Sequence, residues 1–133
     1  MTKKTIILIL LIAASNSLFA QKGKINYSRY CSKLIAQVSN EWRMDSLGKN
    51  NFRSKFVQRF MKARIDSVSI SQVRNNLGPP NNTWVEPGKI MYVYYFFSMK
   101  HNAGWLYAEY LVFTFNTETS LLLSISQGDN DRG

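Results

Sequence analysis

Residues Val68 to Pro80 read VSISQVRNNLGPP, and this stretch separates a helical first part of the chain from a second part rich in strand-forming residues. Ser69 and Gln72 have the S-x-x-Q spacing of a capping box, in which each side chain satisfies a free backbone amide at a helix start. Gly78 suits the left-handed conformation that follows a helix, and Pro79–Pro80 cannot continue one. The stretch therefore predicts a short helix that begins at Ser69 and ends before Gly78.

The chain after this stretch has the composition of β-strands. Lys89 to Phe97 and Trp105 to Phe115 are rich in β-branched and aromatic residues, and Ser98 to Gly104 between them has the composition of a hairpin loop. Leu121 to Ser126 predicts a third strand, and Thr83 to Glu86 is a candidate additional strand at the edge. The pattern predicts a three-stranded antiparallel β-meander.

The chain before this stretch predicts two amphipathic helices. Apolar residues recur at helical spacing over about Ser28 to Arg43 and again over about Phe52 to Arg64, with basic residues on the opposite sides. Cys31, the only cysteine, falls on the first apolar stripe, where we expect a buried side chain rather than a reactive thiol. The expected fold class is α+β, with two to three N-terminal helices packed on one face of the three-stranded meander.

The first twenty residues have the layout of a secretory signal peptide. Two lysines precede the apolar run Thr5 to Ala14, and a more polar stretch then ends at Ala20. A membrane-spanning helix needs roughly 20 apolar residues, and this run is about half as long. We expect cleavage after Ala20, which leaves residues 21–133 as a single domain exported to the periplasm or the extracellular space. Gln21 follows the cut where a lipoprotein needs a cysteine, so a lipid anchor is not expected.

Charge is unevenly distributed along the expected mature chain. Residues 22–64 contain eleven Lys or Arg and two acidic residues, whereas residues 65–133 contain four basic and six acidic residues. The basic part is suited to an anionic envelope surface or an acidic partner, although solvated helix faces have the same composition. Export argues against nucleic acid as the partner.

The stretch from Ser69 to Gln127 resembles the SmpA/OmlA (BamE-like) family of envelope assembly proteins. The matching segments are SISQVRNNLGPPNNTW, VYYF and YLVFTFNTETSLLLSIS, which follow the family pattern of a capped helix ending in Leu-Gly-x-Pro, an aromatic strand and a strand-turn-strand. The resemblance implies two helices on one face of a three-stranded antiparallel sheet, and a non-catalytic envelope role. The chain departs from the family in lacking a lipobox cysteine and in its additional basic helix. β-Lactamase inhibitor proteins share a similar plan, so the fold leaves function open.

Reactive chemistry has little support in this sequence. One cysteine and one histidine cannot complete a four-ligand zinc site, and His101 lies in a predicted loop rather than beside a nucleophile. The sequence has no glycine-rich phosphate loop. We therefore expect no catalytic residues, no metal, no cofactor and no enzymatic activity.

Two groups of residues are candidates for binding a protein partner. Strand alternation places tyrosines on both faces of the predicted sheet, and helices can cover only one of them. One face would carry Tyr92, Tyr94, Tyr107 and Glu109, and the other Tyr95 and Tyr110. The competing candidate is a basic surface made of Lys33, Arg53, Lys55, Arg59 and Lys62.

Two functions fit these candidate surfaces. The first is an exported envelope interaction module, as the family resemblance implies. The alternative is a small secreted inhibitor or effector that blocks an enzyme through its aromatic sheet face. A homodimer formed through the sheet is a further expectation for the same exposed aromatic residues.

Overall fold

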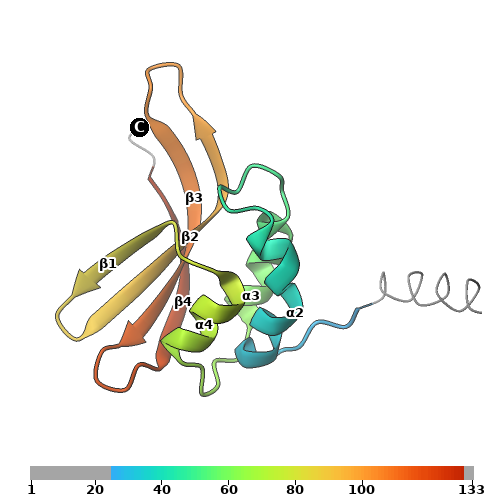
Figure 1. Ribbon diagram of the computed structural model, residues 1–133, viewed down its shortest axis with the longest axis vertical. Helices are drawn as coiled ribbons and strands as arrows, with labels where there is room; N and C mark the ends of the chain where they lie inside the picture. Colours follow the sequence, from blue (N-terminus) through green and yellow to red (C-terminus); the bar gives the residue numbers. More distant parts are fainter. Residues whose placement is uncertain (1–24, 131–133) are drawn as a thin grey trace, which may run out of the picture.

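The computed structural model describes residues 25–130, in which every helix precedes every strand (Figure 1). The predicted signal peptide and its cleavage site after Ala20 lie outside the described residues. The helices form one layer, and the strands form an antiparallel sheet beside it. The predicted α+β class is confirmed.

The first described helix, α2 (Cys31–Arg43), buries the apolar stripe that its sequence predicts. It begins three residues later than the sequence indicates, because the preceding residues pair with the chain beyond the second helical region. The Arg64 amide donates a hydrogen bond to the Arg29 carbonyl at 2.6 Å. The Asp66 carboxylate then accepts from the Ser32 amide at 3.0 Å and satisfies a free donor in the first turn of α2.

The second helical region is divided into a 3-10 helix, η1 (Arg53–Phe56), and a short α-helix, α3 (Val57–Lys62). The sequence pattern predicts one continuous α-helix here, and that prediction is wrong in detail. The 3-10 geometry is tighter than the α-helical geometry, so residues of η1 point in different directions from those that an α-helical wheel assigns. The side chain of Arg53 consequently lies inside the molecule, with 2% of its surface exposed.

The short helix α4 (Ile70–Leu77) has the predicted cap at its start. The Gln72 amide donates to the Ser69 hydroxyl at 3.1 Å, and the Ser69 amide donates to the Gln72 side chain at 2.8 Å. Gly78 ends the helix at a φ of 82°, as the sequence indicates. The guanidinium of Arg43 donates to the Asn76 carbonyl at 3.0 Å and thereby joins the ends of α2 and α4.

The sheet has four strands rather than the predicted three. In the order of the sheet they are β1 (Asn82–Glu86), β2 (Lys89–Lys100), β3 (Leu106–Asn116) and β4 (Leu122–Asp129), each antiparallel to its neighbour. The candidate edge segment is a genuine strand because Gly88, at a φ of 78°, allows a tight turn that folds β1 back along β2. The β2–β3 loop is shorter than predicted, since both strands continue further into it.

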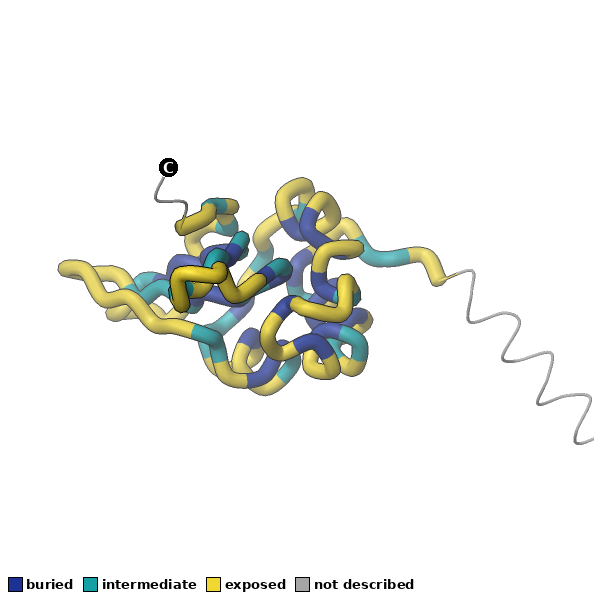
Figure 2. Tube along the Cα trace, turned by 90° about the horizontal axis from the view of Figure 1, so that it is seen from above, coloured by how far each residue is buried: buried dark blue, intermediate teal, exposed yellow. Residues whose placement is uncertain are grey.

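The core lies between the helical layer and one face of the sheet. Figure 2 shows the buried segments concentrated where the two layers meet. Aromatic rings form a continuous series of edge-to-face contacts across this boundary, with centroids 5.2 Å apart for Trp42 and Phe60, and 5.5 Å apart for Phe60 and Phe113. Tyr94 continues the series, with its ring 5.5 Å from Phe113. The helices therefore seal one face of the sheet and leave the other face uncovered by any element among residues 25–130 (Figure 1).

Candidate functional site

The helix-covered face contains the first set of predicted aromatic site residues. Tyr94 is completely buried, and its hydroxyl donates to the Gly78 carbonyl at 2.9 Å. Burial raises the pKa of Tyr94 well above its ordinary value. Tyr92 is half-buried beside it, with its ring 5.4 Å from that of Phe115. The hypothesis that Tyr94 contributes to a binding surface is wrong, because it belongs to the core.

Tyr107 and Glu109 share this face of the sheet, as predicted, but lie on the opposite half of the β2–β3 hairpin from Tyr92. The Tyr107 hydroxyl donates to the Glu109 carboxylate at 3.3 Å, and its ring lies 6.1 Å from that of Phe97. Phe97 faces this side because the register shifts between Tyr95 and Phe97. In Figure 1 this half of the hairpin extends past the helices.

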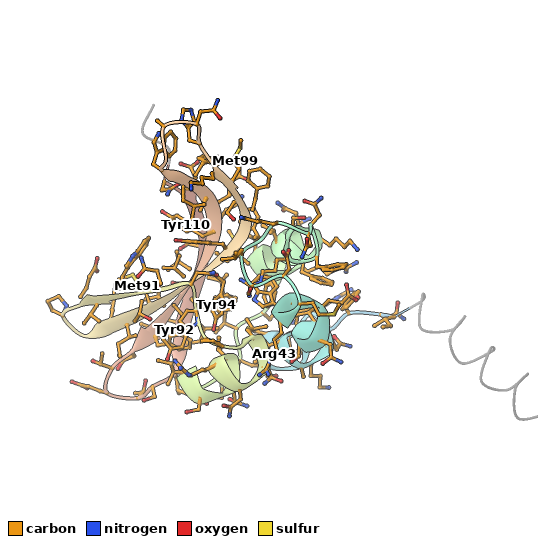
Figure 3. All side chains as sticks on the ribbon, turned by 45° about the horizontal axis from the view of Figure 1, so that its top comes forward. Arg43, Met91, Tyr92, Tyr94, Met99 and Tyr110 are labelled. Carbon is orange, nitrogen blue, oxygen red and sulfur yellow. The ribbon has the colours of Figure 1, made fainter. Side chains whose placement is uncertain are left out.

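The open face carries an aromatic pair formed by Trp84 of β1 and Tyr110 of β3. Their rings contact edge to face, with centroids 5.5 Å apart and planes at 90°. Trp84 is 37% exposed, and Met91 and Tyr95 lie half-buried on the same face. Figure 3 shows Met91 and Tyr110 on the side of the sheet away from the helical layer. We call Trp84, Met91, Tyr95 and Tyr110 the aromatic patch.

Tyr110 is held in a fixed orientation. Its hydroxyl donates to the Asp129 carbonyl at 3.0 Å, and its ring covers Gly128 of the neighbouring strand. A Cβ atom at Gly128 would lie 2.8 Å from the Tyr110 ring, so a larger residue there would displace the ring. Burial, and secondarily the charge of Asp129, raises the pKa of Tyr110. A side chain ordered in advance loses little conformational freedom when a partner covers it.

Most of the predicted basic surface is exposed on the helical layer. Lys55 in η1 and Arg59 and Lys62 in α3 lie on the outside, as does Lys33 of α2. The Arg59 guanidinium lies over the Tyr27 ring, 4.5 Å from its centroid. These four basic side chains are suited to contact with an anionic surface.

Arg53 is a buried structural residue and not part of this basic surface. Its guanidinium donates to the carbonyls of Trp42 at 2.8 Å and Tyr95 at 3.0 Å, and to the Asn81 side chain at 3.0 Å. Burial lowers the pKa of Arg53 to about 10, and the nearby carboxylate of Asp45 opposes that shift. The group remains protonated at neutral pH. Because only 2% of its surface is exposed, the hypothesis that Arg53 binds a partner is wrong.

Asp45 and Asn81 complete this buried polar cluster. The Asp45 carboxylate accepts from three backbone amides, those of residues 50, 52 and 53, at 2.8 to 3.2 Å. The Asn81 side chain accepts from the Tyr95 amide at 2.8 Å and donates to the Ser46 carbonyl at 2.6 Å. The cluster thus fixes the turn over 45–51 along the part of β2 that β1 does not cover.

Sequence reasoning missed Trp84, Met91 and Asn81. Trp84 and Met91 are opposite each other in the β1–β2 pairing, so the open face becomes visible only once β1 is recognised as a strand. The sequence signal was the turn at Pro87–Gly88, which Glu86 separates from the apolar pair Trp84–Val85. Asn81 lies in a polar run that gives no indication of a long-range contact.

Reactive groups are not gathered in the described part of the chain. Burial raises the pKa of the Cys31 thiol to about 12, with the charge of Asp66 adding to the effect, which disfavours a nucleophilic thiolate. Within residues 25–130, no group of three or more His, Cys, Asp or Glu is placed to hold a metal ion. None of the helices in this range is long and apolar enough to span a membrane.

No protein-family model, curated protein or solved structure matches this chain. Function is therefore inferred from the surfaces of the molecule itself.

Proposed function

We propose that this protein is an exported, non-catalytic interaction module of the cell envelope that binds a protein partner through the aromatic patch. The observation that carries the proposal is the Trp84–Tyr110 pair, which lies on the face of the sheet that the helices leave uncovered. The envelope location rests on the resemblance of residues 69–127 to SmpA/OmlA proteins and on the signal-peptide layout of residues 1–20.

The composition of the aromatic patch favours a protein partner over a small molecule. Tyrosine, tryptophan and methionine are enriched at protein interfaces, where aromatic anchors contribute most of the binding energy. The two valines between the patch residues, Val93 and Val112, are paired in the β2–β3 register and are buried. Removal of one such anchor typically costs about 2 kcal/mol of binding free energy.

The alternative is a small secreted inhibitor or effector that blocks an enzyme. The observation that favours it is the β2–β3 hairpin, which extends beyond the helical layer (Figure 1). Near its tip, Met99 is 50% exposed and Leu106 is 37% exposed. A narrow hairpin with apolar side chains is suited to the concave site of an enzyme, and the neighbouring aromatic patch would cover the rim of that site.

The basic side chains of the helical layer supply a second, weaker contact. Lys33, Lys55, Arg59 and Lys62 are exposed residues of α2, η1 and α3, in the helical layer that lies on the other face of the sheet from the aromatic patch. We assign to them an anionic envelope surface, which a basic patch attracts through charge that salt screens.

Site-specific photo-crosslinking in the producing cells tests the proposal. A photoreactive residue at Trp84 reports on the open face, and the same residue at Val85 is a matched control. Val85 is the next residue of β1, faces the other side of the strand and is 74% exposed. We expect protein adducts from position 84 and not from position 85.

The identity of the adducts separates the two functions. Envelope assembly proteins support the interaction module, whereas a captured hydrolase supports the inhibitor. Adducts that form only from Lys62, or equally from both positions of β1, contradict a binding role for the aromatic patch.

A further inference from the structure

Gly128 of β4 lies opposite Tyr110 of β3, and the tyrosine ring crosses it. Gly128 does not have a positive φ, so its backbone conformation does not require a glycine. A glycine inside a strand often marks the close approach of another group. Here that group is the Tyr110 ring, whose nearest atoms lie 2.8 to 3.3 Å from the position that a Cβ atom at residue 128 would take. Gly128 therefore provides the space that the ring occupies.

Three contacts hold the Tyr110 ring in place. Trp84 contacts it from the direction of β1, with ring centroids 5.5 Å apart. Gly128 lies against it from the direction of β4, because β3 stands between β2 and β4 in the sheet. The Tyr110 hydroxyl donates to the Asp129 carbonyl at 3.0 Å, which fixes the far end of the ring. The position of the Trp84–Tyr110 pair therefore depends on the backbone of residues 128 and 129.

Asn130 fastens that backbone to β3. Its amide donates to the Ala108 carbonyl at 3.1 Å. Its side chain donates to the Leu106 carbonyl at 2.9 Å and accepts from the Ala108 amide at 2.7 Å. The side chain of Asn130 thus continues the hydrogen bonding of β4 beyond its last residue, and it holds the chain in place on the far side of Asp129.

Residues 128–130 lie away from the core. Asp129 and Asn130 are exposed, and Gly128 is half-buried near the end of the outer strand β4. None of these three residues belongs to the cluster of buried side chains between the helical layer and the sheet. Substitutions in this segment should therefore move Tyr110 without unfolding the protein.

We propose that Gly128, Asp129 and Asn130 form a positioning segment that holds Tyr110 against Trp84 and thereby sets the affinity of the aromatic patch for its partner. The segment acts through Tyr110, whose ring is ordered before binding. A side chain that is mobile in the free protein must be ordered when a partner covers it, and this lowers affinity. The effect on affinity rests on the proposed function, whereas the orientation of the ring is measurable without a partner.

Nuclear magnetic resonance of the purified protein tests the orientation of the ring. In Gly128→Ala the added Cβ atom meets the end of the Tyr110 side chain, which moves more readily than the paired backbone. We expect the wild-type protein to show nuclear Overhauser effects between the Tyr110 and Trp84 rings, and Gly128→Ala to lose them. The matched control is Ser126→Ala, on the same strand and the same face, which should keep them.

Asn130→Ala tests the segment without adding any atom near the ring. It removes both side-chain hydrogen bonds to β3 and leaves the Tyr110 ring intact. We expect the nuclear Overhauser effects between Tyr110 and Gly128 to weaken, because the backbone beneath the ring is no longer fixed. Circular dichroism of both variants checks that the sheet and the helices are retained.

Photo-crosslinking from position 91 measures the consequence for binding. Met91 belongs to the aromatic patch, and a photoreactive residue there preserves both Trp84 and Tyr110. We expect Gly128→Ala and Asn130→Ala each to lower the yield of protein adducts about two- to tenfold, which corresponds to the cost of ordering one side chain on binding. Ser126→Ala should leave the yield unchanged.

Three results would overturn the proposal: ring contacts between Tyr110 and Trp84 that persist in Gly128→Ala and Asn130→Ala, an equal loss of these contacts in Ser126→Ala, or a displaced ring with an unchanged adduct yield. Absence of adducts from the wild-type protein would instead reject the proposed function. The resonance measurements would still decide whether the segment positions the ring, so the two failures are distinguishable.

Discussion

The two faces of the sheet use neighbouring tyrosines in opposite ways. Tyr94 lies beneath the helices with no exposed surface and donates to the Gly78 carbonyl, whereas Tyr95 lies on the open face and is only half-buried. The covered face also receives the buried guanidinium of Arg53, 5.8 Å from the Tyr94 ring. The difference in burial predicts that substitutions on the covered face lower stability more than substitutions on the open face, for which we propose a binding role.

The largest expected effect is on the covered face. Tyr94→Ala removes a ring that contacts Trp42 and Phe113 and should lower the free energy of unfolding by about 4 kcal/mol, because a core cavity remains. Tyr95→Ala, on the open face, should cost about 1 kcal/mol. Urea denaturation followed by circular dichroism measures both values. Equal losses would contradict the division between the two faces.

The next effect concerns the buried charge beneath the sheet. Arg53→Met should lower the free energy of unfolding by about 3 kcal/mol, because it removes the side-chain donor to the Tyr95 carbonyl and one of the two donors to the Trp42 carbonyl. Lys55→Met, an exposed residue of the same 3-10 helix, should change it by less than about 0.5 kcal/mol. Similar effects from both substitutions would show that Arg53 is solvated like its neighbour.

A smaller effect is expected where the turn over 45–51 meets β2. Gly48→Ala would place a Cβ atom 2.7 Å from the Phe96 carbonyl carbon at a φ of 67°, and should cost about 2 kcal/mol. Gly104→Ala, at a φ of 91° with no atom within 4 Å of the added Cβ, tests backbone strain alone and should cost about 1 kcal/mol. Thermal unfolding of both variants measures the difference, and a Gly48 variant no less stable than the Gly104 variant would mean that the turn does not seal this edge.

The sequence predicted correctly those features of the fold that depend on residues close together in the chain. The capping box at Ser69 and the glycine stop at Gly78 are confirmed because both ends of each interaction lie within one turn of helix. The inward position of Arg53 escaped prediction, since its partners Trp42 and Tyr95 lie eleven and 42 residues away. Periodicity alone treats an arginine outside an apolar stripe as exposed.

The candidate site was predictable only in part. Alternation correctly placed Tyr95 and Tyr110 on one face and Tyr92 and Tyr94 on the other. Which face the helices cover depends on how the layers pack, and single-strand alternation carries no information about that choice. The place of Trp84 in the aromatic patch could not be predicted from alternation, because it depends on the pairing of β1 with β2 as a fourth strand.

The central claim is that the open face binds a partner through aromatic contacts rather than charge. The most direct test measures the affinity of the partner captured from position 84, by calorimetry in low and in 1 M salt. We predict that wild-type binding persists in 1 M salt, where charges are screened beyond about 3 Å, and that Tyr110→Ala weakens it about 30-fold at both salt concentrations. Binding that survives Tyr110→Ala and Trp84→Ala but disappears in high salt, or on replacement of Lys55, Arg59 and Lys62 by serine, would contradict the claim.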